Sequence, residues 1–243
     1  KRAHDYLEVT SLQDLKLVGR WDVADKKVEE LALKLALTKN TEDKKKIAGE
    51  IFDKAFEKGI YPYSINDFYM ARGKGEFKGF SVPAINIRAM TFYMASAIFR
   101  VAKKINAGAF IFEIAKSEMG YTDQKPVEYA ATCVAAALSE GYTGPVFIQG
   151  DHFQFNAKKF AENKDAEISA MKALITDSVH SGFFNIDIDS STLVDLTKKD
   201  VMEEQKNNYE MCALMTNFIR EIQPAGIQVS VGGEIGEVGK ANS

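Results

Sequence analysis

Residues 144–153 read GPVFIQGDHF, and the organisation of the whole chain is best understood from this stretch. Residues 146–148 form a short apolar run bounded by glycine and proline, which is typical of a buried strand. The stretch ends at Asp151 and His152, and functional groups of parallel α/β proteins lie where strands end. Successive side chains of a strand point to opposite faces, so the acid and the imidazole are expected to do different jobs around one substrate. From this pair alone, a helix-capping aspartate beside a surface histidine is the favoured interpretation.

Strands alternate with helices from about residue 80 onward. The expected strands are residues 80–87, 109–115, 146–149, 183–189 and 227–234. The expected helices are residues 91–105, 126–140, 165–180 and 202–222. Alternation at this spacing predicts βαβ units with right-handed crossovers and a parallel sheet.

Acidic side chains stand near the carboxyl ends of several of these strands, namely Glu113, Asp151, Asp187, Asp189 and Glu234. Groups spread over many strand ends favour a (β/α)₈ TIM barrel over a doubly wound sheet with one switch point. Residues 79–243 hold about the first five βα units of such a barrel, which takes about 250 residues when complete. We therefore expect the working protein to extend past Ser243 by roughly three more units.

Residues 1–78 are predicted to be a helical N-terminal extension. One helix is expected over residues 26–37, and a second is expected to follow an N-cap at Thr41 and to end at Gly59. The loop at residues 72–76, RGKGE, has the glycines and basic residues of a phosphate cradle but completes no known motif. We interpret it as a linker.

The composition is that of an ordinary soluble globular protein. The chain of 243 residues is 46% apolar and 27% charged, with a formal net charge of −3. The balanced charge gives no reason to expect a nucleic-acid or membrane partner, and no apolar run approaches the ~20 residues of a membrane span. Cys133 and Cys212 fall within expected helices and have no metal or redox spacing, which indicates reduced thiols and a cytoplasmic protein.

Among the three histidines, only His152 stands at a strand end beside an acid. A catalytic zinc takes about three protein ligands, so His152 needs others, and Glu234 and the pair Asp187 and Asp189 are the candidates. For Asp187 and Asp189 we favour a structural role, as helix caps or ion-pair partners. The place of Glu113, in a local ion pair or in the site, stays open.

Four stretches resemble one known family. They are residues 80–86 (FSVPAIN), the Asp-His pair at 151–152, residues 190–196 (SSTLVDL) and residues 234–236 (EIG). In this order and spacing they resemble motifs of the class II, metal-dependent fructose/tagatose-bisphosphate aldolases. The resemblance covers residues 80 to 239 and leaves residues 1–78 uncovered.

The resemblance implies a zinc-dependent lyase that cleaves a ketose bisphosphate, such as fructose 1,6-bisphosphate, into dihydroxyacetone phosphate and an aldehyde. By position, His152 would be a zinc ligand, Glu234 would lie at or beside the metal, and Asp151 would move the proton of the substrate's C4 hydroxyl. Asp189 and Asp195 would lie in the outer shell. The metal would polarise the ketone, and the family also implies a homo-oligomer.

The chain departs from the family pattern in two places. The carboxylate that acts on the C3 proton is expected a few residues after Glu234, where this chain has lysine, alanine and asparagine at 240–242, and Glu237 is out of register. Thr192 stands where many relatives have histidine. Residues 150–156 and 113–122 also resemble the non-catalytic accessory subunit of tagatose-bisphosphate aldolase. That alternative, and a phosphosugar-binding barrel without turnover, remain open.

Overall fold

The computed structural model describes residues 20–22 and 25–236. The strands are β1 (Arg20–Trp21), β2 (Ile60–Tyr63), β3 (Ala84–Asn86), β4 (Ile111–Ala115), β5 (Tyr142–Gln154), β6 (Asn185–Asp189) and β7 (Ser230–Gly233). The first helices are α1 (Val28–Leu37), α2 (Thr41–Glu57), α3 (Asn66–Gly73), α4 (Thr91–Ile105), α5 (Lys116–Thr122) and α6 (Pro126–Glu140). The later helices are α7 (Ala157–Glu162), α8 (Lys164–Ser181), the 3₁₀ helix η3 (Ser191–Leu193), α9 (Val201–Glu204) and α10 (Lys206–Ile222).

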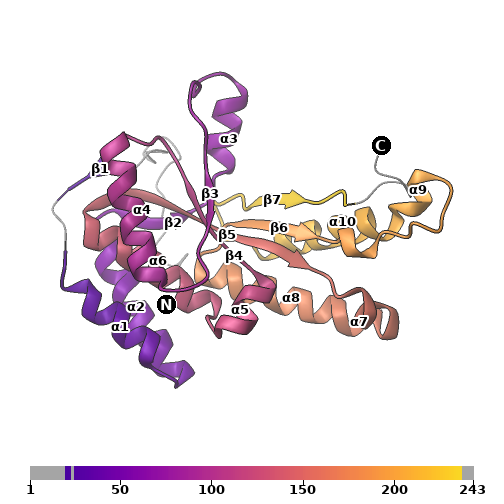
Figure 1. Ribbon diagram of the computed structural model, residues 1–243, viewed down its shortest axis with the longest axis horizontal. Coiled ribbons are helices and arrows are strands. Elements are labelled where there is room, and N and C mark those ends of the chain that lie inside the picture. Colours follow the sequence, from indigo (N-terminus) through magenta and orange to yellow (C-terminus); the bar gives the residue numbers. More distant parts are fainter. Residues whose placement is uncertain (1–19, 23–24, 237–243) are drawn as a thin grey trace.

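The fold is α/β, and its centre is a parallel sheet in the order β3-β4-β5-β6-β7. Each of these strands pairs in parallel with the next one along the chain, with helices in the connections between them. In Figure 1, α1, α2, α6 and α8 lie below the sheet, while α3 projects above it. The carboxyl ends of the parallel strands therefore meet at one edge, as the alternating pattern predicted.

Helix α6 is the centre of the core. Its bounds agree with the sequence prediction because the local signals are strong: Pro126 at its first turn and Gly141 just past its end, where φ is 71°. Nearly every residue of α6 is buried, and many are alanines. The helix packs against α1, α2, α4 and α8, and small side chains allow this close approach from several sides.

The expectation that residues 1–78 are helical is wrong at β2. This strand runs parallel to β5, with Ile60 opposite Gly144 and Tyr63 opposite Phe147. Sequence reading took residues 61–64 as the point where the chain restarts before a helix over 65–71, and it missed the strand because the pairing partner lies some 80 residues away. Helices α1 and α2 occur as expected, although the N-cap of α2 is Asn40, whose side chain accepts from Glu42 and Asp43 amides, and not Thr41. The domain division at residue 78 stays a prediction.

The strands differ from their expected lengths in a systematic way. β3, β4, β6 and β7 are shorter than predicted, whereas β5 spans Tyr142–Gln154 instead of residues 146–149. β5 is long because β4 lines one of its sides, while β2 and then β6 line the other. The predicted helix at 202–222 is divided at Gln205 into α9 and α10.

Two further expectations concern the cysteines and membrane-spanning helices. Cys133 and Cys212 are free and lie on helices, as expected. Within the described ranges, no helix combines the length and the apolar character that crossing a bilayer requires.

Candidate functional site

The candidate site is built on an irregularity in β5. Gly150 pairs with Ile186 of β6, and the next paired residue, Phe153, lies opposite Ile188. Two residues of β5, Asp151 and His152, therefore face the single residue between those partners on β6, which is the arrangement of a β-bulge. Bulges re-aim side chains and are common beside active sites.

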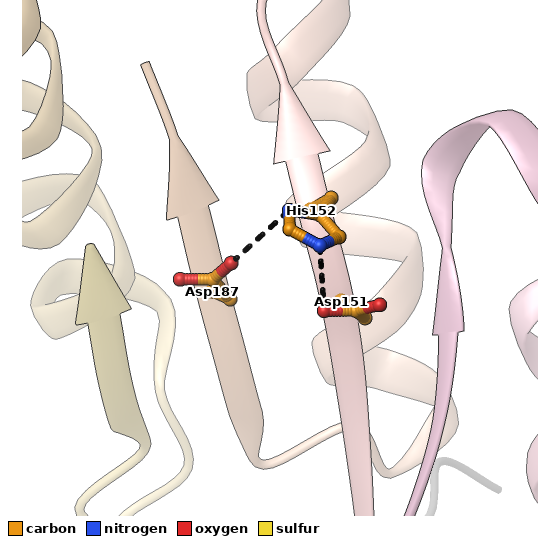
Figure 2. A group of neighbouring side chains, drawn as sticks. All are labelled: Asp151, His152 and Asp187. Atoms are coloured by element: carbon orange, nitrogen blue, oxygen red, sulfur yellow. Dashed lines mark ion pairs between the residues drawn. The ribbon is translucent and has the colours of Figure 1, made fainter. Parts of the chain in front are cut away.

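The bulge overturns the expectation that Asp151 and His152 point to opposite faces. His152 has a φ of 44°, in the left-handed region that a non-glycine residue rarely adopts. This turn of the backbone places the His152 Nε2 atom 3.6 Å from Asp151 Oδ1 and the Nδ1 atom 3.9 Å from Asp187 Oδ2. Figure 2 shows the imidazole between the two carboxylates, one on its own strand and one on β6.

Two glycines give this arrangement its space. A Cβ on Gly150 would lie 2.4 Å from the ring of Phe153, which is itself fully buried. A Cβ on Gly232 of β7 would lie 3.0 Å from Asp187 Oδ1. Glycine at these positions lets the bulge close over Phe153 and lets the Asp187 carboxylate stand beside β7.

His152 faces more negative charge than the sequence suggested. Its Nδ1 atom is also 3.4 Å from Asp189 Oδ2 and 3.6 Å from Glu234 Oε1. Partial burial alone would lower the pKa of His152, but Asp151, Asp187 and the two further carboxylates together raise it above the ordinary value. The side chain stays 51% exposed, so a ligand can reach it.

Two carboxylates in the site have raised pKa values. Burial raises the pKa of Glu113 to about 7, and the neighbouring Asp151 carboxylate adds to the shift. Burial raises the pKa of Asp187 to about 6, with repulsion from Glu234 as the next cause and His152 acting in the opposite direction. Glu113 also accepts a hydrogen bond of 3.0 Å from Gln149 Nε2 on the adjacent strand. Glu113 thus lies beside the cluster, where it contacts Gln149.

Asp189 has a structural environment. It is 3% exposed, and its Oδ1 accepts from the Ser191 backbone N–H at 3.1 Å and from the Ser191 hydroxyl at 2.6 Å. Its Oδ2 accepts from Gln154 Nε2 at 2.8 Å. Both oxygens therefore have donors already, which suits a carboxylate that fixes the end of β6. Asp187 differs, because its carboxylate interacts with the backbone of His152 and lacks the side-chain donors that Asp189 has within the described residues.

Glu234 follows β7 and is held near His152 through its backbone. The buried side chain of Asn208 on α10 donates to the carbonyls of Glu234 at 2.8 Å and Ile235 at 3.0 Å. The Ser190 hydroxyl donates to Asn208 Oδ1 at 2.7 Å, which ties this loop to the end of β6. The side chain of Glu234 is 41% exposed, so a ligand can reach its carboxylate.

Other predicted residues lie elsewhere. Asp195 accepts from the Thr197 backbone and hydroxyl and pairs with Lys198, so these side-chain contacts are within its own loop. The hydrogen bonds from Thr197 lower the pKa of Asp195. The structure does not bring it to His152. Thr192 donates to a backbone carbonyl, that of Phe155. Glu237 and residues 240–242 lie outside the described residues.

The predicted loop at residues 72–76 is in part helical, because α3 continues to Gly73. The amides of Lys74, Gly75 and Glu76 donate to carbonyls of Met70, Arg72 and Ala71 respectively. These amides are therefore used to end α3 and do not form an anion cradle.

Sequence reasoning missed a second group of polar residues beside the cluster. Asn86 Nδ2 donates to Glu118 Oε2 at 2.8 Å and to Asp151 Oδ2 at 3.3 Å. Glu118 Oε1 pairs with Arg88 Nε, and Glu118 Oε2 also accepts from the Ala115 amide at 2.9 Å. Burial alone would raise the pKa of Glu118, but these donors together lower it. Asn86 and Glu118 lie within the stretches 80–86 and 113–122 quoted for the resemblance, but their contact with each other follows from the parallel register, which places Asn86 beside Glu113.

The donor set fits a divalent cation. One ligand atom each from Asp151, His152 and Asp187 lie within 4.8 Å of one another, and Glu234 approaches the same imidazole. An imidazole with carboxylates suits zinc and the harder divalent ions of similar size. The structural role expected for Asp187 is thus incomplete, because Asp187 is part of this group.

A comparison with models of known protein families found no match for this chain, and a comparison with curated proteins found no significant similarity.

Proposed function

We propose that the protein is a metal-dependent aldehyde-lyase of the class II fructose-bisphosphate aldolase type, which cleaves a ketose bisphosphate in a reversible aldol reaction. The observation that carries the proposal is the bulge in β5, which assembles Asp151, His152 and Asp187 at the carboxyl edge of a parallel sheet. An acid, an imidazole and further carboxylates in contact are what metal-assisted proton transfer requires.

The strand order supports a (β/α)₈ barrel as the complete architecture. The five central strands follow one another across the sheet without the reversal that marks a doubly wound sheet. Within the described part of the chain, β3 and β7 each pair on one side only, so both edges are available for further strands. Functional groups on β4, β5, β6 and after β7 also suit a barrel, where many strands contribute to one site.

The two nitrogens of His152 divide the site into two sides. Nδ1 faces Asp187 and Glu234, and we assign these two carboxylates, with His152, as the residues that would bind a metal. Asp189 on the same side has its oxygens engaged by Gln154 and Ser191. Of the carboxylates in the described part of the chain, Asp151 is the one that Nε2 faces, so we assign Asp151 to proton transfer.

The proposed reaction uses this division. When bound, the metal acts as a Lewis acid toward the ketone and stabilises negative charge that develops there. Asp151 accepts the proton of the C4 hydroxyl, the oxygen's electron pair forms the carbonyl of the aldehyde, and the C3–C4 bond breaks with its electron pair moving toward the ketone. C3 then takes up a proton from solvent, which completes dihydroxyacetone phosphate. Asn86, which donates to Asp151 Oδ2, holds this carboxylate in place. The raised pKa of Glu113, about 7, provides a second group able to hold a proton near neutral pH.

The test is an assay of fructose 1,6-bisphosphate cleavage by the full-length protein, before and after treatment with a chelator. We expect cleavage that disappears with the metal and returns on adding zinc. Cleavage that persists in chelator, with no bound metal, would exclude the class II assignment. Bound metal without cleavage would favour the accessory-subunit alternative.

A further inference from the structure

The strongest unexplained feature of the site is the group formed by Arg88, Glu118 and Asn86. Glu118 is 5% exposed and accepts from three donors, including Arg88 Nε, so the guanidinium is anchored by a buried carboxylate. Exposed ion pairs contribute little to stability, and Arg88 itself is 63% exposed. The ion pair between Arg88 and Glu118 is therefore expected to contribute little to the stability of the fold.

Arg88 lies on the same side of the sheet as Asp151. It follows β3 by two residues, and the extended pairing continues, since the Ile87 amide donates to the Glu113 carbonyl. Ile87 is buried, so by alternation Asn86 and Arg88 share the opposite side, the side of Asp151. The chain of contacts from Arg88 through Glu118 and Asn86 reaches Asp151 in three steps.

The terminal nitrogens of Arg88 are uncommitted. Among the described residues, only its Nε atom has a hydrogen-bond partner, which leaves Nη1 and Nη2 for a ligand. Lys116, the basic residue that directly follows β4, makes a useful contrast. Its Nζ donates to the Gln154 carbonyl at 2.8 Å and pairs with the buried Glu167 at 3.4 Å, so it is already used.

A buried acceptor nearby also lacks a donor. Asn86 Oδ1 is buried and has no hydrogen-bond partner, although its Nδ2 makes two bonds. A buried polar atom without a partner costs free energy unless something fills its place. A ligand hydroxyl beside Asp151 would donate to it, and an oxyanion on the same ligand would reach Arg88.

We propose that Arg88, positioned by Glu118, binds a phosphate group of the substrate, and that Asn86 Oδ1 accepts from a hydroxyl next to that group. The inference rests on the proposed function for the identity of the substrate. The carboxylates around His152 repel an anion, so a phosphorylated ligand needs a fixed cation at the edge of the cluster. A guanidinium with two free nitrogens binds a phosphate through paired hydrogen bonds, which lysine does less well.

The test titrates glycerol 3-phosphate, with glycerol as its neutral counterpart, into the zinc-loaded full-length protein by calorimetry. In Arg88→Met we expect binding of glycerol 3-phosphate to weaken by about 10- to 100-fold, because charge-assisted hydrogen bonds are lost. The affinity of Arg88→Lys for glycerol 3-phosphate should lie between those of Arg88→Met and the unaltered protein. Glycerol should bind equally weakly to all of them, and melting temperatures measured in parallel report folding.

Arg100→Met is the matched control. Arg100 is 58% exposed and pairs with the little-exposed Glu140, as Arg88 does with Glu118, but it lies on α4. Its loss should leave binding unchanged. Binding in Arg88→Met equal to the unaltered protein, equal weakening in both arginine variants, or no phosphate binding at all would overturn the proposal.

The outcome is separable from that of the proposed function. If glycerol 3-phosphate binding depends on Arg88 but no ketose bisphosphate is cleaved, the phosphate subsite stands and the lyase assignment fails. If cleavage occurs and Arg88→Met leaves its KM unchanged, the lyase assignment stands and the subsite fails.

Discussion

The two halves of β5 differ in strand pairing, exposure and backbone conformation. From Tyr142 to Ile148 the strand is regularly paired with β1, β2 and β4 in turn, and Phe147 and Ile148 are 3% and 0% exposed. From Gln149 to Gln154 the pairing with β6 is broken by a bulge, and the half-exposed His152 adopts a left-handed backbone. The first half is shaped by apolar burial, while the second keeps strain and repelling charges that burial alone does not explain. Such departures are common at functional sites.

The largest expected effect is on turnover through the irregular half. Asp151→Asn should keep the fold, because the amide has nearly the same shape, but it cannot take up the substrate proton. General acid–base groups contribute typically ~10² to 10⁴-fold, so kcat for fructose 1,6-bisphosphate should fall within that range. A variant with unaltered kcat would show that Asp151 is only structural.

The regular half should instead control stability. Phe147→Ala removes a buried aromatic ring and should lower the free energy of unfolding by about 3–5 kcal/mol. His152→Ala, five residues later at a half-exposed position, should change it by only about 0.5 kcal/mol in the metal-free protein. Urea unfolding of both variants measures the contrast. Equal losses would remove the distinction between the two halves.

Gly150 lies where the two halves meet. A Cβ there would lie 2.4 Å from the Phe153 ring, so Gly150→Ala must displace the ring and should cost about 1–3 kcal/mol. Gly49→Ala on α2 is the control, since nothing lies within 4 Å of the added carbon, and it should stabilise by about 0.5–1 kcal/mol. The same sign for both substitutions in thermal unfolding would contradict this account of Gly150.

The smallest expected effect is on pH dependence. In the folded chain Glu113 holds its proton up to about pH 7, whereas the unfolded chain releases it near 4.5. The folded state then binds more protons between these values, so the contribution of Glu113 to stability falls as pH rises through this window. In Glu113→Gln, which can still accept from Gln149, this decline should be absent, a difference on the order of 1 kcal/mol for a partly open site. Melting curves of the metal-free proteins at pH 5 and 8 that change in parallel would contradict it.

Sequence reasoning succeeded where local signals decide the structure. The bounds of α6 follow from Pro126, Gly141 and the residues between them, and the alternation of strands and helices predicted the parallel sheet. It failed at β2, because the segment around Pro62 has no clear local strand signal and forms a strand by pairing with the distant β5. The presence of Asp151 and His152 in the site was predicted, but their approach on one face was not.

The missed parts of the site depend on register between strands. The bulge is defined by the pairing of β5 with β6. Asp187 joins the cluster because it is the single residue of β6 opposite Asp151 and His152. Asn86, Arg88 and Glu118 come together through the pairing of β3 with β4. No motif within one segment encodes such contacts, since a shift of one residue would send each side chain to the other face.

The most direct test of the central claim, that the bulge in β5 builds a metal site, is the zinc content of the dialysed protein beside that of His152→Ala and Asp187→Asn. The account predicts about one zinc per chain in the unaltered protein, near-complete loss in His152→Ala and weaker retention in Asp187→Asn, with all three folded. Equal zinc content in the three proteins, or none in the unaltered one, would contradict it.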